Sequence, residues 1–203
     1  MLWPTVWDEI QTFCARMAGS RPVLLHLALL AAFGVWIPRA KGIDFFEPEV
    51  LGAYACLGLI FAGPAVAQSS AEGFAPPFVL AIARIITGVL YGEAIVAALL
   101  ATGIATIYVL LRGHYIPTPD WPALASCAVF GLCGAAMAAS LAAWLAAQFS
   151  RTAATAALRV LFFSLLILFY YRGHWLTDVS WKGAAICFAL TAIFLVLLRR
   201  ACR

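Results

Sequence analysis

The stretch Trp121–Gln148 reads WPALASCAVFGLCGAAMAASLAAWLAAQ and contains no Asp, Glu, Lys or Arg. A helix needs about 20 mostly apolar residues to cross the roughly 30 Å hydrocarbon core of a bilayer. This stretch exceeds that length without one charged side chain. It therefore predicts a membrane-spanning helix. We expect most of the chain to be surrounded by lipid and not by water.

The composition of all 203 residues agrees with this prediction, because 65% are apolar and only 11% are charged. Soluble domains average about 45–50% apolar and about 25% charged residues. A soluble globule of this size leaves a large surface exposed and could not bury so much apolar area. The composition excludes a soluble enzyme, a nucleic-acid-binding module and a disordered chain.

Five further apolar runs flank the opening stretch, and the loops between them are short. The six predicted spans cover residues 22–38, 50–68, 88–111, 121–148, 153–171 and 183–198. Short loops favour one compact unit over two domains. We predict an all-α, polytopic membrane helix bundle of six transmembrane helices at residues 21–203, preceded by a separate interfacial helix at residues 1–20.

The N-terminal segment, residues 3–18, has its large apolar residues at helical spacing. Tryptophan and arginine on such a helix are typical of one that lies in the plane of the membrane interface. A first helix packed on protein is the alternative. The acidic pair Asp8 and Glu9 argues against a cleavable signal peptide here.

The apolar run of residues 78–87 raises a question of length. Joined to the span 88–111 it would give a helix of 34 residues, or about 51 Å at 1.5 Å per residue, which exceeds the hydrocarbon core. We therefore predict an interfacial segment over residues 78–87 and a crossing that starts near Gly88. One long tilted helix is the alternative.

Six spans place both termini on the same side, and the basic residues then divide into sets of eight and five. The larger set is Arg16, Arg21, Arg84, Arg151, Arg159, Arg199, Arg200 and Arg203, and the smaller is Arg39, Lys41, Arg112, Arg172 and Lys182. Loops on the cytoplasmic side carry the excess of Lys and Arg. We predict a multi-pass protein of the cell membrane with both termini in the cytoplasm.

Two outer turns share a pattern: RGH, an aromatic residue, an aliphatic residue, then Thr, Asp and Trp. The predicted outer polar cluster is Arg112, His114, Asp120, Arg172, His174 and Asp178. Such a cluster could bind an anionic headgroup or transfer a proton. The alternative is a plain membrane boundary, where Arg, His and aromatic side chains reach the headgroups and Gly ends a helix.

Two charges, Glu93 and Arg159, fall inside predicted spans at similar depth. Ionised groups inside a membrane are costly and usually face a partner. We predict a Glu93–Arg159 ion pair or shared polar network, which either locks the bundle or lies on a transport path. Gly88 and Gly92 form a GxxxG pattern on the same span, which favours close contact between helices.

The six cysteines form no CxxC pair, and most lie within apolar runs, as is typical of small buried side chains. We expect no disulfide framework, no metal site and no cofactor. His26 is isolated in the sequence, and no facing pair of histidines suggests haem.

Two enzyme families share small parts of this pattern. His174 and Asp178, in the order His-x-x-x-Asp-Val, resemble the third motif of the PAP2 lipid phosphatases, where the His is the nucleophile and the Asp orients it. The PSGH-like tetrad of that family is absent. Cys56, at the outer end of the second span, is similar in position to the nucleophile of exosortase-type transpeptidases, although Cys-Leu-Gly replaces their Cys-Ser-Gly.

The layout of the whole chain resembles the permease of an ABC-2-type transporter. The shared features are the interfacial N-terminal helix, six spans, cytoplasmic termini and an interfacial segment after the second span, where Ala71-Glu72-Gly73 is similar to a Glu-containing segment of that family. The resemblance implies a dimeric permease that moves a lipid, glycan or other amphiphile with a separate ATPase. This chain has no GxxxxGK[ST] motif of its own.

We therefore expect a permease-like transporter subunit in the lipid bilayer, with no nucleic-acid partner and no catalysis of its own. One alternative is a non-catalytic subunit or scaffold of a larger membrane complex. The other is an outer-face lipid phosphatase that uses His174 and Asp178.

Overall fold

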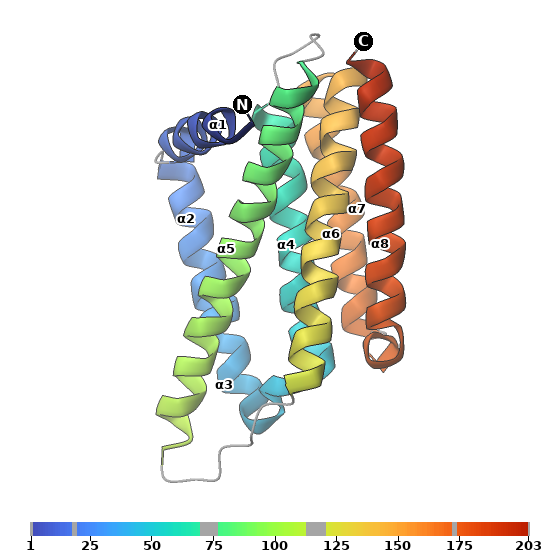
Figure 1. Cartoon of the computed structure of the whole chain (residues 1–203). Helices are drawn as coiled ribbons and strands as arrows, with labels where there is room; N and C mark the ends of the chain where they lie inside the picture. The colour runs from blue at the N-terminus through green and yellow to red at the C-terminus, as the bar shows by residue number, and fades with distance from the viewer. Residues whose placement is uncertain (1, 18–19, 70–76, 113–120, 172–173, 203) are drawn as a thin grey trace.

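The computed structural model describes residues 2–17, 20–69, 77–112, 121–171 and 174–202, and no β-strand occurs among them. The elements are α1 (Leu2–Met17), α2 (Ser20–Leu29), a π-helical segment η1 (Leu30–Trp36), α3 (Ile37–Lys41), a 3-10 turn η2 (Gly42–Phe46), α4 (Pro48–Ser69), α5 (Phe78–Leu110), α6 (Trp121–Gln148), α7 (Arg151–Tyr171) and α8 (His174–Ala201). The long helices run side by side in one bundle (Figure 1). The all-α bundle predicted from composition is confirmed.

Five helical stretches among the described residues are long and apolar enough to cross a membrane. They correspond to the joined α2–η1–α3–η2 segment from Val23 to Phe46, α4, α5, α6 and α8. Helix α7 runs along the same bundle, and the apolar stretch described within it is Thr152–Leu165. Both chain termini lie at one end of the bundle, hereafter the terminal end (Figure 1).

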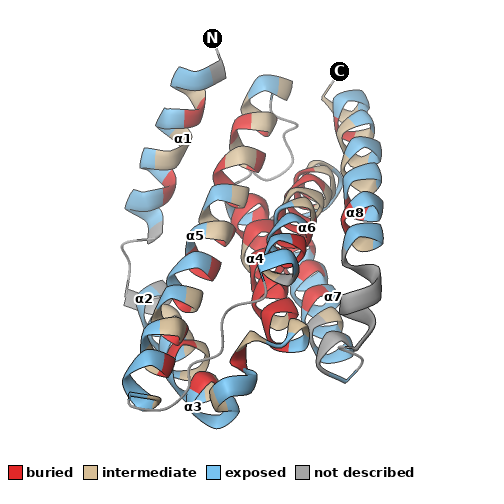
Figure 2. Cartoon of the chain, turned by 60° about the horizontal axis from the view of Figure 1, so that its bottom comes forward, coloured by how far each residue is buried: buried red, intermediate tan, exposed pale blue. Residues whose placement is uncertain are grey.

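Helix α4 is the centre of the bundle. In an 18-residue apolar window 89% of its residues are buried, against 22% for α5 and 17% for α8, and Figure 2 shows the buried residues gathered on α4 and on the sides of its neighbours that face it. From Val50 to Ser69 the helix has no charged side chain and many small ones. A helix that is apolar on every side can be covered on every side, and α4 packs against α5, α6, α7 and α8.

The first membrane-crossing segment contains the π-helical turn of η1. A π-helix displaces backbone carbonyls from their usual partners four residues on, and in lipid every such group needs a donor. Here neighbouring helices supply donors: the Tyr54 hydroxyl donates to the Phe33 carbonyl, and Thr106 Oγ1 donates to the Gly34 carbonyl at 2.8 Å. The widened turn is therefore held by α4 and α5.

Helix α5 is continuous over 33 residues, from Phe78 to Leu110. The prediction of an interfacial segment over residues 78–87 is therefore wrong, and the single long tilted helix is observed, oblique to its neighbours (Figure 1). No proline interrupts α5, and its first turns are covered by protein, because α1 packs on them. One of the features shared with ABC-2-type permeases is thus absent.

The Gly88–Gly92 pattern brings α5 into direct contact with the backbone of α4. A Cβ atom on Gly88 would lie 2.9 Å from the Ala62 carbonyl oxygen, and one on Gly92 would lie 2.6 Å from that of Gly58. Real Cβ atoms do not approach an oxygen so closely. The close helix contact predicted from GxxxG is confirmed.

Helix α1 lies across the terminal end instead of along the bundle (Figure 1). One face packs on α5 through the buried Val6 and Phe13, while Trp3 and Trp7 remain exposed. Arg84 Nε lies 3.5 Å from Glu9 Oε1, and both side chains are almost buried. The helix thus combines both expectations: one side rests on protein and the other presents tryptophans, which favour a membrane interface.

Helix α8 begins at His174, nine residues before the predicted start of the last span. Residues 174–182 contain no Pro or Gly, so nothing in the local sequence stops a helix there. Gly183 instead serves packing, since a Cβ atom on it would lie 2.9 Å from the Phe130 ring of α6. Most of the segment predicted to be the second outer turn is therefore the first part of α8.

Candidate functional site

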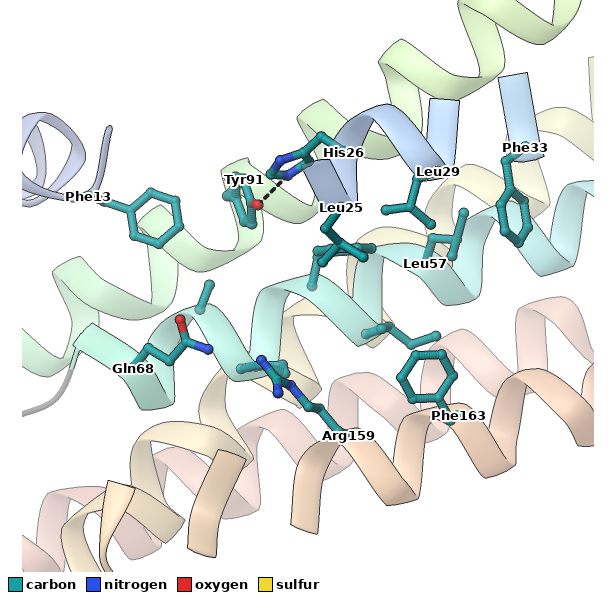
Figure 3. A pocket seen from close by; sticks show the side chains of 14 residues that line it. Phe13, Leu25, His26, Leu29, Phe33, Leu57, Gln68, Tyr91, Arg159 and Phe163 are labelled. Carbon is teal, nitrogen blue, oxygen red and sulfur yellow. Dashed lines mark hydrogen bonds between the residues drawn. The ribbon is translucent and has the colours of Figure 1, made fainter. Parts of the chain in front are cut away.

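A cavity of about 470 Å³ lies between α2, α4 and α7 at the half of the bundle nearer the terminal end (Figure 3). We call it the α2–α7 groove. Its lining residues are Phe13, Leu25, His26, Leu29, Phe33, Leu57, Ile60, Phe61, Pro64, Ala65, Gln68, Tyr91, Arg159 and Phe163. Helix α4 contributes six of these and forms the floor, while α2 and α7 form the walls.

The groove opens sideways, toward the surface that lipid covers in a membrane. Leu25 on α2 and Phe163 on α7 are about half exposed, at 51% and 52%. Both are apolar side chains on helices that flank the cavity. A lipid-soluble molecule could therefore enter from the bilayer without crossing water.

Polar groups gather toward one end of the groove, and the other end is apolar. Gln68 and Arg159 lie toward the end nearer α1, whereas Leu29, Phe33 and Phe163 occupy the other end (Figure 3). From Leu57 to Gln68 the floor spans twelve residues, and the eleven steps between them cover about 16 Å at 1.5 Å per residue. The groove is thus itself amphipathic along its length.

His26 and Tyr91 form a hydrogen-bonded pair on the wall. His26 Nε2 lies 2.6 Å from the Tyr91 hydroxyl, across α2 and α5. The Phe13 ring meets the Tyr91 ring edge-on at 4.8 Å between centroids, and Phe61 flanks both members of the pair. The imidazole and the hydroxyl group hydrogen-bond to each other. Together with the rings of Phe13 and Phe61 they connect α1, α2, α4 and α5 beside the cavity.

Arg159 supplies the positive charge of the groove. Its α-carbon is eight residues along α7 from Arg151, about 12 Å by helix rise. Within the described part of the chain the one ion pair is Arg84–Glu9, so Arg159 has no carboxylate partner there. Its guanidinium group retains its full capacity to bind an anion.

Pro64 adds a backbone acceptor to the floor. Proline has no N–H, so the carbonyl of Ile60, four residues earlier, lacks its usual helical donor. Both residues line the groove. Among the residues that line the floor, α4 therefore has one carbonyl without its usual helical donor.

No protein-family model, curated protein or solved structure matches this chain.

The predicted Glu93–Arg159 ion pair is not formed among the described residues. Glu93 Oε1 faces α4 and α6, close to Gly58 and Gly131, while Arg159 lines the groove. The expectation that Glu93 and Arg159 lie at similar depth assumed that the span starts near Gly88, whereas α5 begins at Phe78. Glu93 is fifteen residues along α5, about 22 Å by helix rise.

The predicted outer polar cluster is described only in part. Arg112 is exposed just after α5, at the end of the bundle opposite the termini. His114, Asp120 and Arg172 lie outside the described residues. His174 and Asp178 fall at the start of α8, four residues apart and so on one face of the helix, but their side chains also lie outside the described part.

Cys56 is 1% exposed, inside a cluster with Ala55, Phe130, Ala184 and Cys187. Helices α4, α6 and α8 enclose it. This is the environment of a packed structural thiol, since a nucleophilic cysteine needs access and a stabilised thiolate.

The sequence did not reveal the groove. His26, Gln68 and Tyr91 are each ordinary in their own segments, and only the packing of α2, α4 and α5 joins them. The one local signal was Arg159, an unexplained charge within an apolar run.

Proposed function

We propose that this integral membrane protein is a permease-like transporter subunit that binds an anionic amphiphile in the α2–α7 groove. The headgroup, a phosphate or carboxylate, lies at Arg159, and the apolar tail lies along Leu29, Phe33 and Phe163. The observation that carries the proposal is an arginine without a carboxylate partner at the polar end of a laterally open, apolar groove.

The cost of an isolated charge supports an anionic ligand. An arginine at the centre of a membrane-spanning helix costs about 2.5–3.5 kcal/mol on insertion scales. Side chains of a helix lean toward its N-terminus, which for α7 is the terminal end. Arg159 thus reaches toward the headgroup layer, where a phosphate or carboxylate can accept two of its N–H donors.

The experiment measures bound lipid by native mass spectrometry after purification from nanodiscs. The nanodiscs contain equal amounts of an anionic and a zwitterionic phospholipid with the same acyl chains. We expect wild-type protein to retain the anionic lipid preferentially. Arg159→Gln should lower that preference about tenfold, since a hydrogen bond to a charged group contributes about 1.5 kcal/mol or more.

Arg199→Gln is the matched control, because it removes the same charge from a residue that is exposed like Arg159 but lies at the end of α8, outside the groove lining. It should leave the preference unchanged. Ala65→Phe fills the floor of the groove and should reduce retention of both lipids. Equal effects of the two arginine substitutions would mean that binding is general surface electrostatics, and the proposed site would be wrong.

The transport part of the proposal has its own test. Purification from the native membrane with its lipid should co-elute an ATP-hydrolysing subunit and two copies of this chain. The bundle described has the groove but no element of its own for using ATP. Recovery of a complex without any ATPase would replace the permease with a non-catalytic subunit or scaffold.

A further inference from the structure

Glu93 occupies the centre of the bundle, where α4, α5 and α6 meet. It is near the middle of α5, and it faces Gly58 near the middle of α4. A Cβ atom on Gly58 would lie 3.2 Å from Glu93 Oε1, and one on Gly131 of α6 would lie 3.9 Å from it. The absence of side chains at these two glycines leaves a slot that Glu93 Oε1 occupies, while the residue as a whole is half-buried.

The slot offers Glu93 Oε1 no hydrogen-bond partner. This oxygen is buried and unpaired, and the atoms around the facing glycines belong to Ala55, Val96 and Ala135. The titratable and charged side chains on the described parts of the helices around it are Glu49, Tyr54 and Cys56 on α4, Cys127 and Cys133 on α6, and Arg84, Tyr91 and Tyr108 on α5, with Arg112 just after α5. Of these, Tyr54 donates to Phe33, Tyr91 is bonded to His26, and Arg84 is paired with Glu9.

Ionisation would place negative charge on a half-buried carboxylate whose Oε1 is buried without a donor or a cation. That arrangement costs far more than a neutral carboxylic acid, so the group takes up a proton instead. We propose that Glu93 is a proton-binding site: it holds a proton while α4, α5 and α6 pack as described, and releases it when α4 and α6 separate. This inference does not depend on the α2–α7 groove or its ligand.

Infrared spectroscopy of the protein in vesicles tests the bound proton directly. The wild-type spectrum minus that of Glu93→Gln should show the carbonyl band of a protonated carboxylic acid at neutral pH, shifted in heavy water. Glutamine has nearly the same shape, so the fold should persist. A difference spectrum with only carboxylate bands at neutral pH would overturn the proposal.

Two glycine variants test whether the slot controls the proton. Gly58→Ala places a methyl group 3.2 Å from Oε1 and must displace the carboxyl, so the band should shift or disappear. Gly131→Ala, at 3.9 Å, is the matched control and should leave the band in place. Identical spectra for the two variants would contradict a site defined by Gly58.

Buried cysteines report whether proton release opens the helices. Cys56 on α4 and Cys127 on α6 are 1% and 6% exposed, whereas Cys14 on α1 is exposed. Raising the pH should increase labelling of Cys56 and Cys127 by a small neutral maleimide several-fold more in wild type than in Glu93→Gln. Cys14 should label alike in both proteins. Equal labelling of the buried cysteines in both would show that Glu93 does not control the packing.

Discussion

Adjacent residues on α5 have opposite roles at the contact with α4. Gly92 has no side chain because the Gly58 carbonyl would lie 2.6 Å from a Cβ atom there. Glu93 places its carboxyl in space that Gly58 leaves open. Small residues let membrane helices approach closely, and here the close approach also defines the surroundings of the one acidic side chain of α5.

Gly92→Ala should destabilise the bundle, because the new methyl group meets backbone, which cannot rotate away. Overpacking of this kind costs about 1–3 kcal/mol. We expect a lower midpoint of thermal unfolding in detergent.

Gly131→Ala is the matched control on α6, where the nearest atom would be 3.4 Å away. The gain in helix propensity, up to about 1 kcal/mol, should leave it as stable as wild type or slightly more so. A Gly92→Ala protein as stable as the control would show that α4 and α5 are less tightly packed than described.

At the scale of the element, α5 depends on α1 for its first turns. These turns extend the helix beyond the length that a bilayer core requires, and α1 covers them through Val6, Phe13 and the Glu9–Arg84 pair. The pair connects the amphipathic helix to a helix that also lines the α2–α7 groove through Tyr91. Movement of α1 would therefore change the wall of the groove.

Glu9→Gln should loosen α1, because it leaves Arg84 as a nearly buried charge without its carboxylate. The loss of one such partner costs about 1–3 kcal/mol, enough to speed local amide exchange about tenfold. Hydrogen–deuterium exchange should rise in α1 and stay unchanged in α4.

Asp8→Asn changes the neighbouring, exposed acid and should leave the exchange of α1 at the wild-type rate. Faster exchange in both variants would indicate that general charge, and not the Glu9–Arg84 contact, holds α1 in place.

For the molecule as a whole, the distribution of basic residues predicts the orientation in the membrane. Arg16, Arg84 and Arg159 lie in the half of the bundle near the terminal end, as do Arg199 and Arg200 at the end of α8. An excess of Lys and Arg marks the cytoplasmic side, so we propose that this end faces the cytoplasm.

Labelling of Cys14 tests this orientation without a fusion partner. Cys14 is exposed on α1, so a membrane-impermeant maleimide should react with it only after spheroplasts are opened. Arg112→Cys in a Cys14→Ser background places a thiol at the other end and should react in intact spheroplasts. The reverse pattern would place the termini outside.

The sequence predicted the helical bundle, the close contact at Gly88 and Gly92, and an unusual charge at Arg159. These depend on local pattern, since hydropathy over about 20 residues and GxxxG spacing are properties of one segment. The sequence analysis placed the start of α5 at Gly88, whereas the helix begins at Phe78. The first turns of α5 are covered by α1, and this contact cannot be read from the local sequence of α5. Among the described residues no ion pair joins Glu93 and Arg159, because which side chains meet depends on how α5 and α7 pack in the bundle.

The sequence alone predicts a helical membrane protein, because long apolar runs without charges can satisfy their backbone groups in lipid only as helices. The central position of α4, the apolar groove beside Arg159 and the two glycines that face Glu93 become visible only in the packed bundle. Which helix faces surround a given side chain depends on how the helices pack. In lipid that packing follows from shape, not from hydrophobicity, which all the helices share.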